Sequence, residues 1–171
     1  MLISGGQTGV DRTALDFAML ACIHCSGWCP LGRKAEDGVI PAKYSLIETS
    51  SPLYQHRTRL NVKDSDATLI FTDGGRSRGT ALTVKCCQLM QKPYLTIIFS
   101  DFSDSLRLHI LQWLQKFKPE ILNIAGPRLS ECPAAAAHVF KILFEVLCSA
   151  ECPPPIWPPE RPSSPSLPLL Y

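Results

Sequence analysis

The stretch ATLIFTDGGRSRGTALTVKCCQLMQKPYLTIIF, residues 67–99, decides the predicted fold. Its two continuous apolar runs, 67–72 and 94–99, are rich in β-branched residues and have the composition of buried parallel strands. A glycine-rich turn at 73–79 and a segment of helical length at 80–90 lie between them. This order predicts a strand, a crossover helix and a second, parallel strand.

The same alternation runs through most of the chain. Strands are expected at 2–4, 26–29 and 120–126, and helices at 11–23, 53–63, 103–117 and 132–150. Residues 30–52 are rich in Gly, Pro, Ser and charge, and predict a long irregular loop, which in a compact domain is usually functional. We therefore predict one α/β domain over residues 1–150, a three-layer Rossmann-like fold with a mostly parallel sheet and helices on both faces.

Residues 151–171 differ in composition from the rest of the chain. This segment holds eight of the 15 prolines. Because proline cannot continue a helix or join the middle of a sheet, we expect a disordered or polyproline-like tail. The functional alternative is a ligand for a proline-reading domain, which rests on composition alone.

Composition narrows the class of function. A formal net charge of +2 argues against a general nucleic-acid binder, which usually has a basic face. No run of about 18 apolar residues predicts a membrane span, and no basic segment precedes an apolar core at the N-terminus. We therefore expect a cytoplasmic protein. Its eight cysteines are then reduced thiols, and the single C-x-x-C at 22–25 lacks the second pair of a zinc site.

A first glycine turn, Gly5-Gly6-Gln7-Thr8-Gly9, joins the first strand to the first helix. Glycines allow positive φ angles and let a backbone approach another group closely. The start of the following helix attracts anions, and the Gln7 and Thr8 side chains add donors. We interpret the turn as a phosphate site; the alternative is a tight turn that binds no ligand.

A second turn, GGRSRGT at 74–80, has the same position after a strand and before a helix. Both turns follow parallel strands, so they are expected on the same rim of the sheet and on either side of one crevice. Ser77, Gly79 and Thr80 would then hold a phosphate from the side opposite the first turn. Arg76 and Arg78 either pair with phosphate oxygens or are solvated loop charges.

Other candidate residues lie outside the two turns. Asp11 either caps the first helix or accepts a hydrogen bond from a hydroxyl or ring N–H of the ligand. Arg57 and Asn61 are spaced to share one helix face and to form a polar wall of the site. The segment LNIAGPRLSE, 122–131, contributes Arg128, which is expected to reach back to the rim, and Glu131. Arg57 and Arg128 would supply positive charge.

Five segments resemble the "putative molybdenum carrier" family in the same order. They are ISGGQTGVDRTALDFAML (3–20), GWCPLGRKAEDGVIPAKYSLIET (27–49), YQHRTRLNVKDSDATLIF (54–71), GRSRGTALTVKCC (75–87) and LNIAGPRLSECP (122–133). That family is related to algal molybdenum-cofactor carriers and, more distantly, to lysine-decarboxylase-like proteins that include phosphoribohydrolases. The resemblance covers residues 1–147 and implies a Rossmann-like fold with a phosphate-bearing ligand at the two glycine turns. It also implies a molybdopterin-type cofactor that is bound without being transformed, and a homo-oligomer, either a dimer or a tetramer.

The alternative function is hydrolysis of a nucleotide or a nucleotide-like metabolite. Phosphoribohydrolases carry a P-G-G-x-G-T turn and an acid soon after it, whereas this chain has GRSRGT at 75–80 followed by ALTV. Cleavage of an N-glycosidic bond needs an acid to protonate the leaving base or to position water. An enzyme would therefore have to use Glu36, Asp37 or Asp66.

Overall fold

The computed structural model describes residues 1–75 and 77–148, so the expectations for Arg76 and for the proline-rich tail lie outside the described residues. Five strands form one sheet in the order β2-β1-β9-β7-β8, and every neighbouring pair is parallel. They are β1 (Leu2–Ile3), β2 (Cys25–Ser26), β7 (Ala67–Thr72), β8 (Tyr94–Ile98) and β9 (Leu122–Ala125). The predicted α/β fold with a parallel sheet is confirmed.

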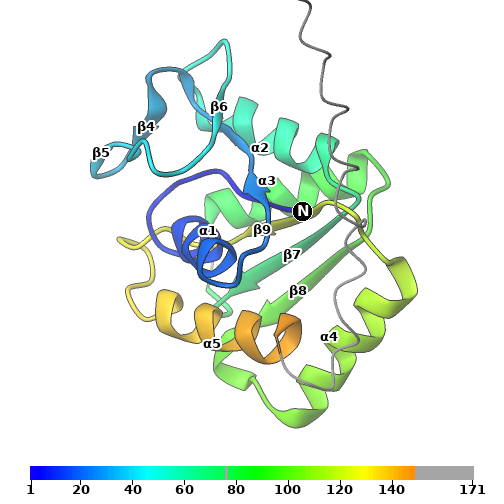
Figure 1. Ribbon diagram of the computed structural model, residues 1–171. Coiled ribbons are helices and arrows are strands. Elements are labelled where there is room, and N and C mark those ends of the chain that lie inside the picture. The colour runs from blue at the N-terminus through cyan, green and yellow to red at the C-terminus, as the bar shows by residue number, and fades with distance from the viewer. Residues whose placement is uncertain (76, 149–171) are drawn as a thin grey trace, which may run out of the picture.

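Helices cover both faces of this sheet (Figure 1). On one face lie α1 (Val10–Leu20), α4 (Asp104–Phe117) and α5 (Ala135–Leu147), with α5 packed against α1 and α4. On the other face α2 (Tyr54–Asp64) packs against α3 (Arg78–Leu89). These layers make the three-layer, Rossmann-like arrangement predicted from the sequence. None of the helices within residues 1–75 and 77–148 has the length and apolar character needed to span a bilayer.

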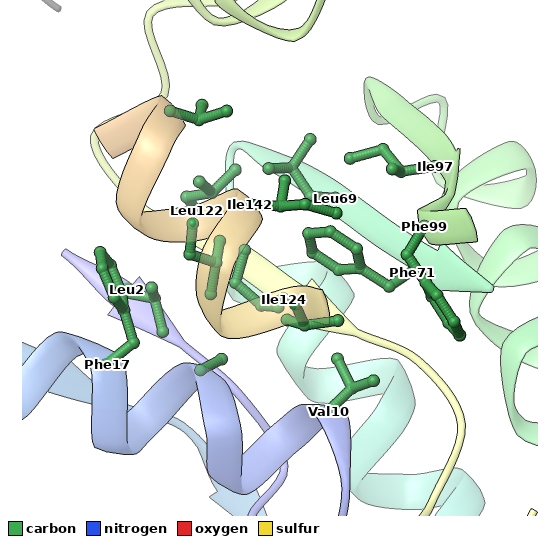
Figure 2. Close-up of a cluster of buried hydrophobic side chains, with 14 of the residues drawn as sticks. Leu2, Val10, Phe17, Leu69, Phe71, Ile97, Phe99, Leu122, Ile124 and Ile142 are labelled. Atoms are coloured by element: carbon green, nitrogen blue, oxygen red, sulfur yellow. The ribbon is translucent and has the colours of Figure 1, made fainter. Parts of the chain in front are cut away.

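The central strand β7 contributes to two cores. Leu69 and Phe71 belong to the large core beneath α1, α4 and α5, which Figure 2 shows. Ile70 points the other way and packs with Val62 of α2 and Cys86 of α3. Because successive side chains of a strand alternate between faces, a strand buried on both sides must be apolar throughout. This explains why the bounds of β7 match the predicted strand.

The order of the strands is that of a circularly permuted Rossmann sheet. If the chain began with β9 and α5, the order would read 3-2-1-4-5, as in a Rossmann sheet. Here the β9–α5 unit comes last in the chain and its strand lies between β1 and β7. Val146 near the end of α5 and Leu2 of β1 belong to the same large core.

The predicted strand at 26–29 is wrong, because Gly27 divides it. Gly27 has a φ of 139°, and a Cβ on it would lie 2.0 Å from the carbonyl oxygen of Ser4. After this turn the chain leaves the main sheet, and β3 (Trp28–Cys29) pairs instead with β6 (Ile47–Glu48).

Residues 30–52, called the long segment below, are more ordered than an irregular loop. They include a 3₁₀ turn, η1 (Leu31–Arg33), and a small hairpin of β4 (Lys34–Ala35) and β5 (Gly38–Val39). The guanidinium of Arg33 donates to the carbonyl oxygens of Ile40 (3.0 Å) and Tyr44 (2.9 Å). The hydroxyl of Tyr44 donates to Asp16 of α1 at 3.0 Å, which anchors the segment to the main domain.

The first and last helices are shorter than predicted, and β8 is less buried than predicted. The first helix ends at Leu20 instead of residue 23, because Cys22 adopts a φ of 54°, which is not helical. The N–H of Ile23 then donates to the carbonyl oxygen of Ala18, as at many helix C-termini. The last helix occupies 135–147 and not 132–150. β8 was expected to be buried, but it is the edge strand of the sheet, and Ile98 is partly exposed.

Candidate functional site

A cavity of about 200 Å³ lies at the carboxyl ends of the central strands. Four parts of the chain line it: the turn after β1, α2, the start of α3 and the turn after β9. The lining residues are Gln7, Tyr54, Gln55, Arg57, Thr58, Ser77, Arg78, Gly79, Leu82, Gly126, Arg128 and Glu131. The helix that follows β9 covers one face of the sheet, and the helix that follows the neighbouring β7 covers the other. The cavity is therefore at the topological switch point, where α/β proteins bind ligands.

The lining of this switch-point cavity is rich in positive charge. Arg57, Arg78 and Arg128 all line it, and the start of α3 adds the partial positive charge of a helix N-terminus. The hydroxyl of Ser77 caps this helix by accepting from the N–H of Thr80 at 3.3 Å. In the described part of the chain Glu131 is the single lining carboxylate. This balance of charge favours an anionic ligand.

Arg57 forms a buried ion pair with Asp11, which does not itself line the cavity. Nη1 of Arg57 lies 3.0 Å from Oδ2 of Asp11, and the two side chains are 15% and 4% exposed. Burial raises the pKa of Asp11 above its ordinary value, and the charge of Arg57 opposes that rise. The N-cap of α1 is Gly9, so the capping role considered for Asp11 is wrong. Its contact with a ligand hydroxyl or N–H stays a prediction.

Protein groups approach the glycines of the first turn closely. A Cβ on Gly5 would lie 2.0 Å from Nη1 of Arg57. Gly6 (φ 72°) packs under the long segment, where a Cβ would lie 2.4 Å from Leu46. Gly9 (φ 74°) faces the turn after β9, with a Cβ 2.7 Å from the carbonyl oxygen of Pro127. These three glycines are thus explained by contacts within the protein.

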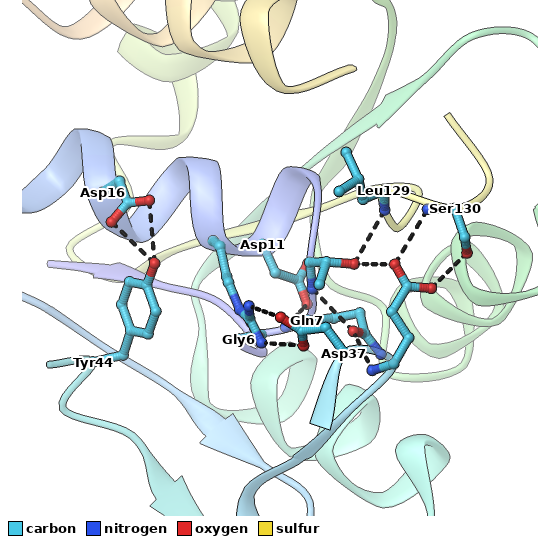
Figure 3. A network of polar contacts seen from close by, with 11 residues as sticks. Gly6, Gln7, Asp11, Asp16, Asp37, Tyr44, Leu129 and Ser130 are labelled. Atoms are coloured by element: carbon cyan, nitrogen blue, oxygen red, sulfur yellow. Dashed lines mark hydrogen bonds and ion pairs between the residues drawn. The ribbon is translucent and has the colours of Figure 1, made fainter. Parts of the chain in front are cut away.

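Hydrogen bonds from Ser130, which Figure 3 labels, join the turn after β9 to Glu36 of the long segment. The carboxylate of Glu36 accepts from the hydroxyl of Thr8, from the hydroxyl of Ser130 and from the N–H of Ser130 at 3.2 Å. Nε of Arg128 is 3.8 Å away. Desolvation alone would raise the pKa of Glu36, but these hydrogen bonds outweigh it and lower the pKa below its ordinary value. Glu36 is therefore an ionised tether.

Like Glu36, the other two acids considered for hydrolysis do not line the cavity. Asp37 forms an ion pair with Arg12, at 2.6 and 2.8 Å, and the hydrogen bond from Arg12 lowers the pKa of Asp37. Asp66 directly precedes β7, at the amino ends of the strands, opposite the cavity. There its carboxylate accepts a hydrogen bond from the N–H of Ile121 at 2.7 Å. Asp66 is therefore too far from the cavity to be its acid.

The structure brings five of the predicted site residues to the cavity: Gln7, Arg57, Ser77, Gly79 and Arg128. The other six are outside its lining: Gly5, Gly6, Thr8, Gly9, Asp11 and Thr80. Thr80 is buried in the first turn of α3, and its hydroxyl has no hydrogen-bond partner among the described residues. Whether any of the eleven contacts a ligand stays a prediction.

Three lining residues of α2 were not foreseen, namely Tyr54, Gln55 and Thr58. Tyr54 and Thr58 line the cavity beside Arg57. Residues three and four positions apart share a helix face, so the predicted position of Arg57 could have indicated Tyr54, three positions before it. Thr58 directly follows Arg57, so this spacing did not indicate it.

A second, larger hollow of about 470 Å³ lies between β8 and α4 at the edge of the sheet. Its lining residues are Thr96, Ile98, Asp101, Ser103, Ser105, Leu106 and His109. This hollow is away from the switch point, and no arginine or lysine of the described residues lines it. The smaller switch-point cavity is therefore the better candidate for an anionic ligand.

The fold and the cavity together define a permuted Rossmann-like protein whose switch point is lined by arginines. The chain belongs to the circularly permutated YpsA SLOG family, whose sequence model matches residues 2–147. It is also similar to the crystal structure of a "putative molybdenum carrier protein" from Syntrophus aciditrophicus. The two share 41% sequence identity over 85% of this chain and 93% of that one, with a TM-score of 0.83. No curated protein matches the chain. The resemblance inferred from sequence motifs is confirmed.

Proposed function

We propose that the switch-point cavity binds the phosphate-bearing end of a small cofactor or nucleotide, and that the protein carries this ligand without transforming it. The observation that carries the proposal is the convergence of Arg57, Arg128 and the start of α3 on one cavity. The cargo we propose is a molybdopterin-type cofactor, in line with the carrier name given to the Syntrophus protein.

The dimensions and donors of the cavity fit the end of such a ligand. Ser77 and Gly79 supply donors at the start of α3, while Arg57 and Arg128 supply two guanidinium groups that suit phosphate oxygens. Pockets that enclose a whole drug-sized ligand measure roughly 300–1,000 Å³. At about 200 Å³ this cavity suits a phosphate and its immediate neighbours, and the ring system would then lie along the rim.

Hydrolysis by any of the three acids considered from the sequence is disfavoured by their positions. A hydrolase must present an acid to the leaving base. Glu36 is fixed by Thr8 and Ser130 with a lowered pKa, Asp37 is paired with Arg12, and Asp66 is at the amino ends of the strands. None of these three is placed to deliver a proton into the cavity.

Mass spectrometry of the small molecules released from natively purified protein tests the proposal. We expect a phosphate-bearing compound, and saturable binding of a fluorescent pterin phosphate that is recovered unchanged. Incubation with nucleoside monophosphates should release no free base. Time-dependent release of base by pure protein would replace the carrier proposal with the hydrolase alternative.

We propose further that the protein acts as a homo-oligomer in the cytoplasm, as the sequence resemblance implies. Light scattering during size-exclusion chromatography checks the first point, with a dimer or tetramer expected and a monomer contradicting it. Localisation of the tagged full-length chain checks the second.

A further inference from the structure

Glu131 brings a negative charge into a cavity lined by three arginines. Its Oε2 accepts from the hydroxyl of Ser77 at 2.8 Å, and its Oε1 accepts from Nε of Arg128 at 3.1 Å. The carboxylate therefore lies between the start of α3 and the turn after β9. These are two of the parts of the chain that we propose hold the phosphate.

Hydrogen bonds of the backbone fix the position of the main chain at Glu131, whereas its side-chain carboxylate can exchange its hydrogen-bond partners. The N–H groups of Glu131 and Cys132 both donate to the carbonyl oxygen of Arg128, at 3.1 and 3.0 Å, which sets the turn. The side chains of Arg128 and Glu131 are 42% and 32% exposed. Ion pairs this exposed contribute little to stability, so a ligand can take over either partner at small cost.

A carboxylate in this position disfavours one kind of ligand and favours another. It repels a bare phosphate group, since both are negatively charged. It can also accept a hydrogen bond from a hydroxyl close to that phosphate, and a site with such an acceptor strongly rejects analogues that lack the hydroxyl. The other charged lining groups, Arg57, Arg78 and Arg128, carry no acceptor and cannot make this distinction.

We propose that Glu131 is a specificity-determining residue that accepts a hydrogen bond from a hydroxyl next to the phosphate of the ligand. The cavity then selects phosphorylated molecules of the sugar-phosphate type over phosphate esters without hydroxyls. The inference rests on the proposed function and names the class of ligand for the same cavity.

Ribose 5-phosphate and methyl phosphate are matched probes, because both are phosphate monoesters and only the first has hydroxyls. Calorimetry at fixed ionic strength should show that the full-length wild-type chain binds ribose 5-phosphate more tightly. In Glu131→Ala we expect about fivefold tighter binding of methyl phosphate, because a repulsive charge is lost. Ribose 5-phosphate should bind about tenfold more weakly, because its charged acceptor is lost.

Two further variants separate charge from hydrogen bonding. Glu131→Gln keeps a neutral acceptor and should bind methyl phosphate as Glu131→Ala does, while losing less affinity for ribose 5-phosphate. Glu145→Ala removes one negative charge from α5, where Glu145 pairs with Lys141, and should leave the ratio of the two affinities unchanged. Thermal unfolding of each variant checks that it is folded.

Different failures have different meanings. If wild type binds neither probe, the proposed function fails and this inference falls with it. If wild type binds both probes equally, or if Glu131→Ala changes both affinities in the same direction, the phosphate site stands and the role of Glu131 is refuted.

Discussion

The carboxylate of Asp11 and the guanidinium of Arg57 meet at 3.0 Å in a pair that is nearly closed to solvent. Asp11 is in the first turn of α1 and Arg57 is in α2, on opposite faces of the sheet. The pair passes beside Gly5, where a side chain would overlap the guanidinium. Arg57 of the cavity is therefore positioned by Asp11 of α1 and by Gly5 of the turn that connects β1 to α1.

Replacement of Asp11 should destabilise the protein more than replacement of an exposed acid. In Asp11→Ala the charge of Arg57 stays largely buried without its partner, which we expect to cost about 3 kcal/mol of unfolding free energy. Asp37→Ala, which breaks the more exposed pair with Arg12, should cost less than about 1 kcal/mol. Urea denaturation of both variants measures the difference, and equal losses would show that burial of the pair does not matter.

Gly5→Ala should act through Arg57. The new Cβ would lie 2.0 Å from Nη1 of Arg57, so the guanidinium must leave Asp11 or the turn must shift. We expect a loss of about 2 kcal/mol, in the range of overpacked sites, together with weaker binding of methyl phosphate. In an Arg57→Ala background the same substitution should cost much less stability. A double-mutant cycle by urea denaturation that shows no coupling between positions 5 and 57 would contradict this explanation.

Glu36 should make stability depend on pH. Its pKa in the folded protein is lowered below the ordinary 4.5, so the folded state binds its proton less readily than the unfolded state. The stabilisation is therefore present above about pH 4.5 and is lost as the pH falls through the lowered pKa. Wild type should exceed Glu36→Gln in unfolding free energy at pH 7, and the gap should close in acid. A gap that widens in acid would mean that the pKa is shifted the other way.

Arg128→Ala should weaken phosphate binding without unfolding the protein. Its side chain is 42% exposed, so little stability depends on it, whereas a charge-assisted hydrogen bond to phosphate is lost. We expect about tenfold weaker binding of methyl phosphate by calorimetry and a shallower dependence on salt. Lys141→Ala removes an equal charge from the surface of α5 and should change neither. Unaltered affinity in Arg128→Ala would place the anion elsewhere.

The local sequence pattern was sufficient to predict the bounds of an element where all of its residues have the same kind of environment. β7 was predicted with its observed bounds because a strand with a core on both faces is apolar at every position. The two glycine turns were predicted on one rim because all strands of a parallel sheet have their carboxyl ends at the same rim. Gln7 and Ser77 do line the same cavity. The division of 26–29 by Gly27 was missed, because its cause is the backbone of Ser4, which directly follows β1 and is remote in the sequence.

By itself, then, the sequence determined the alternation of strands and helices and the edge of the sheet at which polar turns gather, since both follow from local periodicity and composition. Only the tertiary structure decided that β9 lies between β1 and β7, because Leu122 pairs with Leu2 and Ala67, which are remote from it in the chain. That long-range pairing brings Arg128 and Glu131 to the cavity. It also reveals that Gly5 accommodates an arginine 52 positions away, a steric requirement that no local pattern encodes.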